Sequence, residues 1–461
     1  MVEHKTRLLV LNSYGFIPPL EGGHQRCFNL YCKLTNKFEV TIVSLNSNNS
    51  YRVLDGYDGY KFNYLELPMD ETQIENSRML IPQLRSNSWD LAKMLTYSPT
   101  SDCAIYINKL VSEQDLIVLA HPWMYPYVKS ANAPIIYDAH NNEADAFAAY
   151  YSAESIDAEI ALYAENAALQ VSSGITACSS NDLIDLLDRA LNKSIKHRVV
   201  PNGALESSIS LNDNSDSRSL VFIGSGHFPN VEAAKRLCDI ASNIPNFEFH
   251  IVGTAGLALD KSLVPRNITI HGYLEDFELD TLLSSSMALI NPMLSGSGTH
   301  LKVARAMAAG LPIISTLVGS RGIENAESNG FCICENLNDF RIGIEKLGNS
   351  EYWQRKHLQS LEFSKSNSWN EIGLDFEEFL ISNKREQTPN LQFASTNSEV
   401  DEEFIFNNSK IRETIKFFWK RLPLPIRNYF WLKIYPSLQS YRHKTLSIDS
   451  AFSKFKENVT P

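Results

Sequence analysis

The sequence has no apolar run that approaches the roughly 20 residues of a membrane-spanning helix. Its first residues, "MVEHKTRLLVLNS", contain an acid and only a short apolar run, so they are better read as a first strand than as a secretory signal. We therefore expect a cytoplasmic protein that is not integral to a membrane. Peripheral contact with the inner face of a membrane remains compatible with these features.

The sequence also lacks paired cysteines and an excess of positive charge. Its seven cysteines are odd in number and scattered, and no C-x-x-C occurs, which indicates reduced thiols and neither a disulfide framework nor a zinc site. The net charge of −11 argues against general nucleic-acid binding, which needs a positive surface for the phosphates. We expect no nucleic-acid partner.

Short apolar runs that alternate with helical patterns are abundant. The first series runs from "RLLVLNS" through "EVTIVSL", "DLIVLA", "PIIYDAH" and "GITACS" to "HRVVPNG", and a second series runs from "LVFIGSG" to "GFCICE". Continuous apolar runs are typical of buried parallel strands, and 461 residues are too many for one core. The predicted fold class is α/β, with two doubly wound domains whose strands end at a shared cleft.

Shifts in composition predict the domain boundaries. We expect a first Rossmann-like domain, a polar linker, a second Rossmann-like domain, a flexible linker and a C-terminal extension. Their ranges are 1–205, 206–217, 218–383, 384–408 and 409–461.

The stretch "MALINPMLSGSGTHLKVARAMAAG" predicts a strand, a tight turn and a helix. Glycines let the backbone come close to a ligand, and the first turn of a helix offers unpaired N–H groups to an anion. Lys302 adds a full positive charge in that turn. The pattern suits a diphosphate, although these residues alone are equally compatible with a plain strand-to-helix turn.

The stretch that follows, "AMAAGLPIISTLVGSRGI", resembles the donor-site signature of the group 1, or family 4, glycosyltransferases of the GT-B fold. Further segments resemble that family in the same order: "YDAHNNE", "ACSSNDL", "VVPNG", "VFIGSGHFPNVEAAKRL", "FHIVGTAG" and "ITIHGYLEDFELDTLLSSSMALINP". The resemblance covers roughly residues 7 to 383. It implies a GT-B fold and a nucleotide-diphospho-sugar donor, such as a UDP- or GDP-sugar, and it implies metal-independent and mostly retaining transfer.

The resemblance also assigns roles to residues of the glycine-rich loop. It places the donor diphosphate on the loop Gly296, Ser297, Gly298 and Thr299, with Lys302 neutralising its charge. Arg305 stands where the family has a glutamate that accepts hydrogen bonds from the ribose, and an arginine cannot accept. Two alternatives stay open: Arg305 reaches a phosphate, or it points to solvent or pairs with a nearby acid.

The first domain contributes a second set of candidates. Gly22 and Gly23, in "PPLEGGHQR", are expected to approach the sugar diphosphate from the opposite wall, the alternative being an ordinary turn before a helix. His121 and His140 follow predicted strands, and the resemblance places His121 at the transferred sugar or the acceptor. Lone histidines are more often structural. Asp138 and Glu143 flank His140 and are candidates to orient it, although Glu143 is equally compatible with an acid at a helix start, favoured by the helix dipole.

On the donor side, "GSGHFPN" places Gly224, Ser225 and His227 near the cleft, and Glu324 is expected near the nucleotide base. No D-x-D lies between a strand and a loop, so we predict no metal and no cofactor. Lys302 and a helix dipole would then stabilise the leaving diphosphate by preorganised electrostatics.

The extension contains a segment, residues 409–444, in which basic residues are interleaved with Trp, Tyr and Phe. This composition suits an anionic membrane surface. A helical lid docked on the enzyme or on a partner is the alternative.

Together these features predict a glycosyltransferase that moves a sugar from a nucleotide-diphospho-sugar to a glycan or a lipid-linked acceptor, in surface polysaccharide or glycolipid synthesis. One alternative is a GT-B-like binding or assembly protein that has lost transfer, which Arg305 favours. Another is a nucleotide-sugar epimerase.

Overall fold

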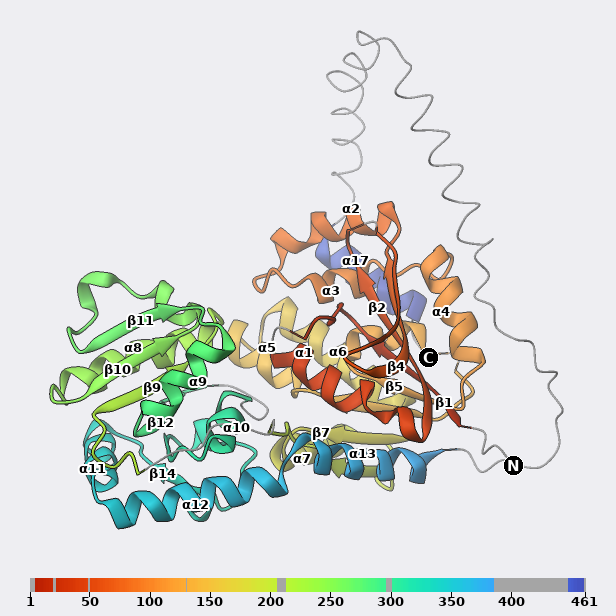
Figure 1. Ribbon diagram of the computed structural model, residues 1–461. Coiled ribbons are helices and arrows are strands. Elements are labelled where there is room, and N and C mark those ends of the chain that lie inside the picture. Colours follow the sequence, from red (N-terminus) through yellow and green to blue (C-terminus); the bar gives the residue numbers. More distant parts are fainter. Residues whose placement is uncertain are drawn as a thin grey trace, which may run out of the picture.

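A computed structural model describes residues 5–19, 22–48, 50–129, 131–204, 213–295, 301–384 and 447–459. Two sheets form two separate α/β units (Figure 1). Gly296, Ser297, Gly298 and Thr299 and the basic aromatic segment 409–444 lie outside the described residues, so their predicted roles stay predictions.

The first sheet has eight strands in the order β3-β4-β2-β1-β5-β6-β7-β8, and every neighbouring pair is parallel except β3 with β4. Its strands are β1 (Thr6–Asn12), β2 (Phe38–Asn46), β3 (Arg52–Tyr57), β4 (Tyr60–Pro68), β5 (Leu116–Leu119), β6 (Ile135–Ala139), β7 (Gly174–Ala177) and β8 (Lys196–Val199). The six strands predicted for this domain are confirmed.

The antiparallel hairpin β3–β4 was not among the predicted strands. Its turn is Asp58-Gly59, and both residues have positive φ, 51° and 82°. An Asp-Gly pair between two alternating runs is a strong local signal for a two-residue hairpin. The signal was therefore present in the sequence.

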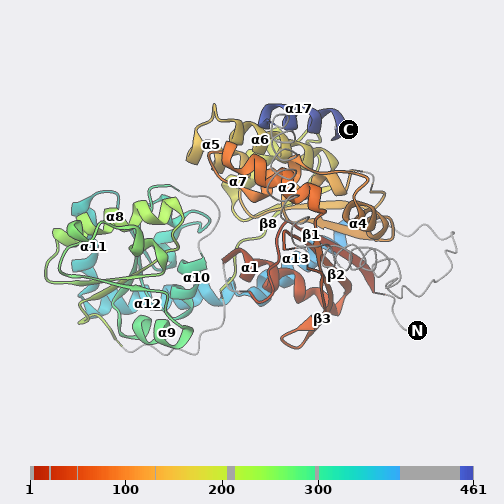
Figure 2. The same ribbon diagram turned by 90° about the horizontal axis from the view of Figure 1, so that it is seen from above.

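Helices cover both faces of the first sheet (Figures 1 and 2). They are α1 (Gly22–Cys27), α2 (Glu71–Leu80), α3 (Trp89–Leu95), α4 (Asp102–Ser112), α5 (Glu143–Tyr151), α6 (Ile156–Val171) and α7 (Ser180–Arg189). Alternate residues of β1 enter different cores: Leu9 packs with α3, α4 and α6, whereas Leu8 packs with the π-helix Phe28–Cys32 that continues α1. Both faces of β1 are therefore buried, as its continuous apolar run predicts.

The second sheet has six parallel strands in the order β11-β10-β9-β12-β13-β14. Its strands are β9 (Ser219–Ile223), β10 (Glu248–Val252), β11 (Ile268–Gly272), β12 (Ala288–Asn291), β13 (Ile313–Ser315) and β14 (Phe331–Ile333). Its helices are α8 (Phe228–Ser242), α9 (Asp276–Ser285), α10 (Leu301–Ala308), α11 (Leu337–Leu347) and α12 (Ser350–Ser366). Residues of α8 and α11 pack on one face of this sheet and residues of α9 and α10 on the other, as expected for a doubly wound domain.

The last helix before the extension, α13 (Trp369–Asn383), returns to the first domain (Figure 1). Phe376 and Phe379 are buried in the core beneath β1, and Arg198 of β8 pairs with Asp375. The predicted second domain, 218–383, therefore ends too late, because α13 belongs by packing to the first domain. An amphipathic helix can cover any apolar face, so the sequence could not tell which one.

A further helix, α17 (Ile448–Val459), lies within the predicted extension and also packs on the first domain (Figure 2). Ile448, Ala451, Phe452 and Phe455 are buried in its core, and the rings of Phe452 and Phe455 meet Tyr163 of α6. In the described ranges, no helix is both long and apolar enough to cross a membrane.

Candidate active site

The carboxyl ends of both sheets face a common space, where the fold predicts a ligand site. Described residues of the two domains approach one another there. A Cβ added at Gly22 would lie 3.1 Å from Leu301 Cδ1, the Ser180 hydroxyl donates to Glu324 Oε1 at 2.8 Å, and the rings of Tyr150 and His227 lie 5.3 Å apart. These contacts bring Gly22, Glu324 and His227 to the interdomain boundary.

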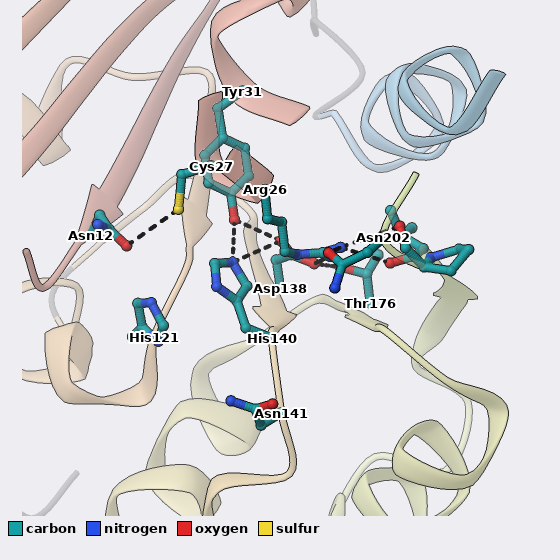
Figure 3. A network of polar contacts seen from close by, with 12 residues as sticks. Asn12, Arg26, Cys27, Tyr31, His121, Asp138, His140, Asn141, Thr176 and Asn202 are labelled. Carbon is teal, nitrogen blue, oxygen red and sulfur yellow. Dashed lines mark hydrogen bonds and ion pairs between the residues drawn. The ribbon is translucent and has the colours of Figure 1, made fainter. Parts of the chain in front are cut away.

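The first domain supplies two histidines from adjacent strand ends. His121 follows β5 and His140 follows β6, and their rings lie 4.5 Å apart at 67°. His121 Nε2 lies 3.3 Å from the hydroxyl of Tyr14, which follows β1, the other neighbour of β5. Neither histidine is isolated, and both belong to one buried cluster (Figure 3).

Asp138 fixes the orientation of His140, as the sequence suggested. The Tyr31 hydroxyl donates to Asp138 Oδ2 at 2.6 Å and lies 2.9 Å from His140 Nε2, which is 3.4 Å from the same carboxylate oxygen. Because the Tyr31 proton points to Asp138, we infer that Nε2 of His140 carries a proton and Nδ1 is the acceptor in the neutral ring. Burial lowers the pKa of His140, and more strongly that of His121, so both rings are neutral at pH 7.

Arg26 is a member of this cluster that the sequence analysis did not identify. It is fully buried, donates to Asp138 Oδ1 at 2.8 Å and also donates to the Val200 carbonyl at 3.0 Å (Figure 3). Despite the burial of Asp138, the Arg26 charge and hydrogen bonds from His140 and Thr176 hold its pKa well below the usual value. The pair joins α1 to the ends of β6 and β8. Its partners are 112 residues apart, so no local pattern reveals it.

Gly23 lies against this cluster as well. A Cβ added there would come within 2.7 Å of the Tyr14 hydroxyl. The Gly22-Gly23 backbone thus lies between Tyr14 on one side and Leu301 of α10 on the other, where a side chain would have little room. The approach of Gly22 and Gly23 to a donor from the opposite wall stays a prediction.

In the second domain, Asn230 joins Ser225 to Lys302. Its side chain donates to Ser225 Oγ at 3.1 Å and accepts from Lys302 Nζ at 2.8 Å. Gly224 lies beside it, since a Cβ added there would meet the Asn230 Cβ at 3.1 Å. Asn230 is the last residue of the stretch "GSGHFPN", and no role was predicted for it from the sequence.

The Lys302 ammonium is surrounded by uncharged groups. Besides Asn230 it lies 3.4 Å from Met293 Sδ and 4.7 Å from the centre of the Phe222 ring. Loss of hydration in this setting lowers the pKa of Lys302 to about 7. The site therefore holds a cation that lacks an acidic partner among these contacts, at the start of a helix next to the glycine-rich loop.

Arg305 is held away from Lys302 by two acids. Its Nη1 pairs with Asp276 and its Nη2 with Asp280 of α9, both at 2.7 Å. This is the arrangement in which the arginine pairs with a nearby acid. A role in phosphate binding would require the guanidinium to leave both partners.

A cavity of about 320 Å³ lies between the domains next to these groups. Its first-domain wall is built mainly by α5, and its second-domain wall by the start of α8 together with Met293. The lining residues are Asn141, Glu143, Ala146, Phe147, Tyr150, Tyr151, His227, Pro229, Asn230 and Met293. Glu143 lines this cavity, and its carboxyl group accepts a hydrogen bond from Asn141 at 3.3 Å, not from His140.

Within the described ranges, no three His, Cys, Asp or Glu side chains are grouped closely enough to share a metal ion.

Comparisons with known proteins agree with this geometry. Residues 217–349 match the model of the family described as glycosyl transferases group 1. A search of curated proteins finds no match.

Solved structures with the same fold are numerous, at low identity. Sucrose-phosphate synthase from Thermosynechococcus elongatus superposes with a TM-score of 0.62 at 14% identity, over 82% of this chain and 99% of that one. Anabaena Alr3699/HepE, in complex with UDP-glucose, superposes with a TM-score of 0.57 at 11% identity, over 82% of this chain and 100% of that one. A trehalose-phosphate synthase from Burkholderia xenovorans, in complex with glucose-6-phosphate, gives the same values.

The α/β architecture, with its two Rossmann-like units, is that of these neighbours, so the predicted fold is confirmed. The resemblance to that family is confirmed for residues 217–349, without its subfamily. The chain has the GT-B fold, and residues 217–349, in its second domain, are similar to the group 1 glycosyl transferases.

Proposed function

We propose that this protein transfers a sugar from a nucleotide-diphospho-sugar to an acceptor bound between its two domains. The observation that carries the proposal is Lys302. Its ammonium lies among uncharged partners at the start of α10, within the region that matches the family. A partly buried cation without an acidic partner among its described contacts is stabilised by an anionic ligand, and a diphosphate supplies that charge.

Transfer requires the departing diphosphate to be stabilised while the sugar develops positive charge. Lys302 and the N–H groups at the start of α10 would act on the diphosphate. His121 and His140 follow strands of the first domain and are neutral, so they would hydrogen-bond sugar or acceptor hydroxyls without adding positive charge beside the reacting carbon.

We further propose that transfer is metal-independent and retaining. Support comes from the family resemblance and from Lys302, a cationic group that would neutralise the diphosphate. Turnover that is unchanged by excess EDTA, with an anomeric configuration kept in the product, is the expected result. Loss of turnover with EDTA that Mg²⁺ restores would contradict metal independence.

UDP- and GDP-sugars are the donors to test first. The neighbour from Anabaena is in complex with UDP-glucose, which supports the choice of a UDP-sugar. Release of nucleoside diphosphate should be measured over a panel of UDP-, GDP- and ADP-sugars, for the full chain and for Lys302→Met. We expect one donor to be consumed and the variant to be at least about a hundredfold slower, as for loss of a transition-state charge partner.

A binding or assembly role is the second candidate, and Arg305 favours it, because its two ion pairs with α9 leave no acceptor at that position for a ribose. The same assay separates the two. A donor that binds tightly and is never consumed, whatever glycan or lipid-linked acceptor is supplied, would indicate the binding role.

We also propose that the protein acts at the inner face of a membrane in surface polysaccharide or glycolipid synthesis, through residues 409–444. The composition of that segment supports this proposal. So does its position in the chain, since α13 before it and α17 after it both pack on the first domain.

A further inference from the structure

The interdomain cavity has an aromatic wall on one helix. Phe147, Tyr150 and Tyr151 lie three and four positions apart and so share one face of α5. Their rings are in mutual contact, with centroids 5.6 Å apart for Phe147 and Tyr151 and 6.3 Å for Tyr150 and Tyr151. All three are only partly buried, so part of each ring faces the cavity.

Hydrogen-bonding groups surround this wall. Glu143 lies one turn before Phe147 on the same face of α5, with Asn141 beside it, and His227 and Asn230 stand across the cavity on the second domain. Aromatic faces edged by uncharged donors and acceptors match a sugar ring, which has apolar C–H faces and a rim of hydroxyls.

The cavity has no cation of its own. None of its described lining residues is Lys or Arg. Lys302 stands behind Asn230 and Met293 and is already assigned to the donor diphosphate. A phosphate placed in this cavity would lose hydration without gaining an ion pair, and it would lie near the Glu143 carboxyl.

The state of Glu143 supports the same conclusion. Burial, with smaller contributions from the negative charges of Glu165 and Asp90, raises the pKa of Glu143 to about 8, against the opposing hydrogen bond from Asn141. At neutral pH the carboxyl group is therefore protonated and both donates and accepts. A protonated carboxyl group can hydrogen-bond a sugar hydroxyl, but it forms no ion pair with a phosphate dianion.

From this geometry we infer that the cavity between α5 and α8 is the acceptor subsite, and that it takes an uncharged sugar ring stacked on the α5 aromatic wall in preference to a sugar phosphate. The inference rests on the proposed function, since it names the second substrate of that reaction. The contact of the cavity with Asn230 and Met293, which hold Lys302, puts such a ring beside the expected donor.

The test uses the full chain saturated with UDP, or with the diphosphate that binds best. Ligand-observed NMR then measures binding of glucose, mannose, galactose and N-acetylglucosamine, each against its 6-phosphate. We expect at least one neutral sugar to bind about tenfold more tightly than its phosphate, since the phosphate has no partner charge there. Stronger binding of the phosphates, or binding of none of the neutral sugars, would overturn the inference.

Three variants locate the binding. Tyr150→Ala should lower the affinity for the neutral sugar by about tenfold, as expected for loss of a stacked ring, while the affinity for UDP stays unchanged. Tyr106→Ala, an aromatic residue outside the cavity, is the matched control and should leave the sugar affinity unchanged. Asn141→Arg should reverse the preference towards the 6-phosphate.

UDP binding in the same samples separates the two possible failures. Failure of UDP, GDP and ADP alike to bind would reject the proposed function itself. Intact UDP binding, with sugar affinity that Tyr150→Ala does not change, would reject only the acceptor subsite.

Discussion

At the scale of single residues, Lys302 makes a proton-linked prediction. Its pKa is lowered to about 7 in the free protein, and a neighbouring diphosphate would raise it. Binding above pH 7 should therefore take up a proton, and affinity should fall by up to about tenfold per pH unit as the pH rises from 7 towards the pKa in the complex. Calorimetric titration of UDP in buffers of different ionisation enthalpy measures this uptake.

Lys302→Met is the control for that measurement. The variant should bind UDP more weakly and without the proton uptake that belongs to the lysine. Equal proton uptake in the variant and in the natural protein would show that another group titrates.

Asp138 makes a stability prediction at the same scale. Asp138→Asn leaves the Arg26 charge buried without its partner, which typically costs about 3–5 kcal/mol. Asp115→Asn is a matched control, because its partner Arg7 is half exposed and such pairs contribute about 1 kcal/mol or less. Urea unfolding, followed by a probe in the first domain, compares the free energies of unfolding. Equal losses in the free energy of unfolding for Asp138→Asn and Asp115→Asn would show that the buried Arg26–Asp138 network is not a main contributor to stability.

The sign of the pH dependence follows from the lowered pKa of Asp138. The pair stabilises the fold above the unfolded-state pKa of an aspartate, and its contribution is lost as the pH falls through the folded-state pKa. The difference in the free energy of unfolding between Asp138→Asn and the natural protein should therefore be largest at neutral pH and decrease at acidic pH.

At the scale of helices and strands, α17 is expected to be part of the first domain. Phe452→Ala removes a buried ring that meets Tyr163, and a change of this kind costs about 3–5 kcal/mol. Lys454→Ala, on an exposed position of the same helix, should change the free energy of unfolding by less than about 0.5 kcal/mol. Thermal unfolding of both variants measures the difference, and an unchanged Phe452→Ala protein would mean that α17 does not dock.

The strands could largely be read from the sequence, because buried parallel strands are continuous apolar runs. "MALINPM" and "LPIIST" became the neighbours β12 and β13, and "PIIYDAH" became β6 with Asp138 and His140 at its end. The β3–β4 hairpin was missed although Asp58-Gly59 signals it. The domain on which α13 packs could not be predicted, because it depends on which apolar surface stays exposed after both sheets have formed.

The candidate site was predictable in part for the same reason. Strand ends meet at one edge of a parallel sheet, and the two predicted strand-end histidines, His121 and His140, lie together there. Arg26, Tyr31 and Asn230 were missed, since their roles arise from contacts between distant segments.

At the scale of the whole molecule, the structure changes how membrane contact should be tested. Deleting 409–461 would remove α17 and so disturb the first domain. Deleting only 409–444 keeps α17. We expect this protein to remain folded and to lose binding to anionic vesicles that the full chain binds, because it loses nine basic residues and the interleaved aromatic residues. Sedimentation with vesicles of anionic and of neutral lipid gives the comparison, and unchanged binding would reject the membrane proposal.

The central claim is that the two domains enclose a nucleotide-sugar site whose cation is Lys302. Its most direct test is calorimetric titration of the full chain with UDP, GDP and ADP, repeated with Lys302→Met. We predict that at least one of these diphosphates binds and that the variant binds it at least about tenfold more weakly, as expected for loss of a charge-assisted contact. Binding of none of the three would contradict the claim.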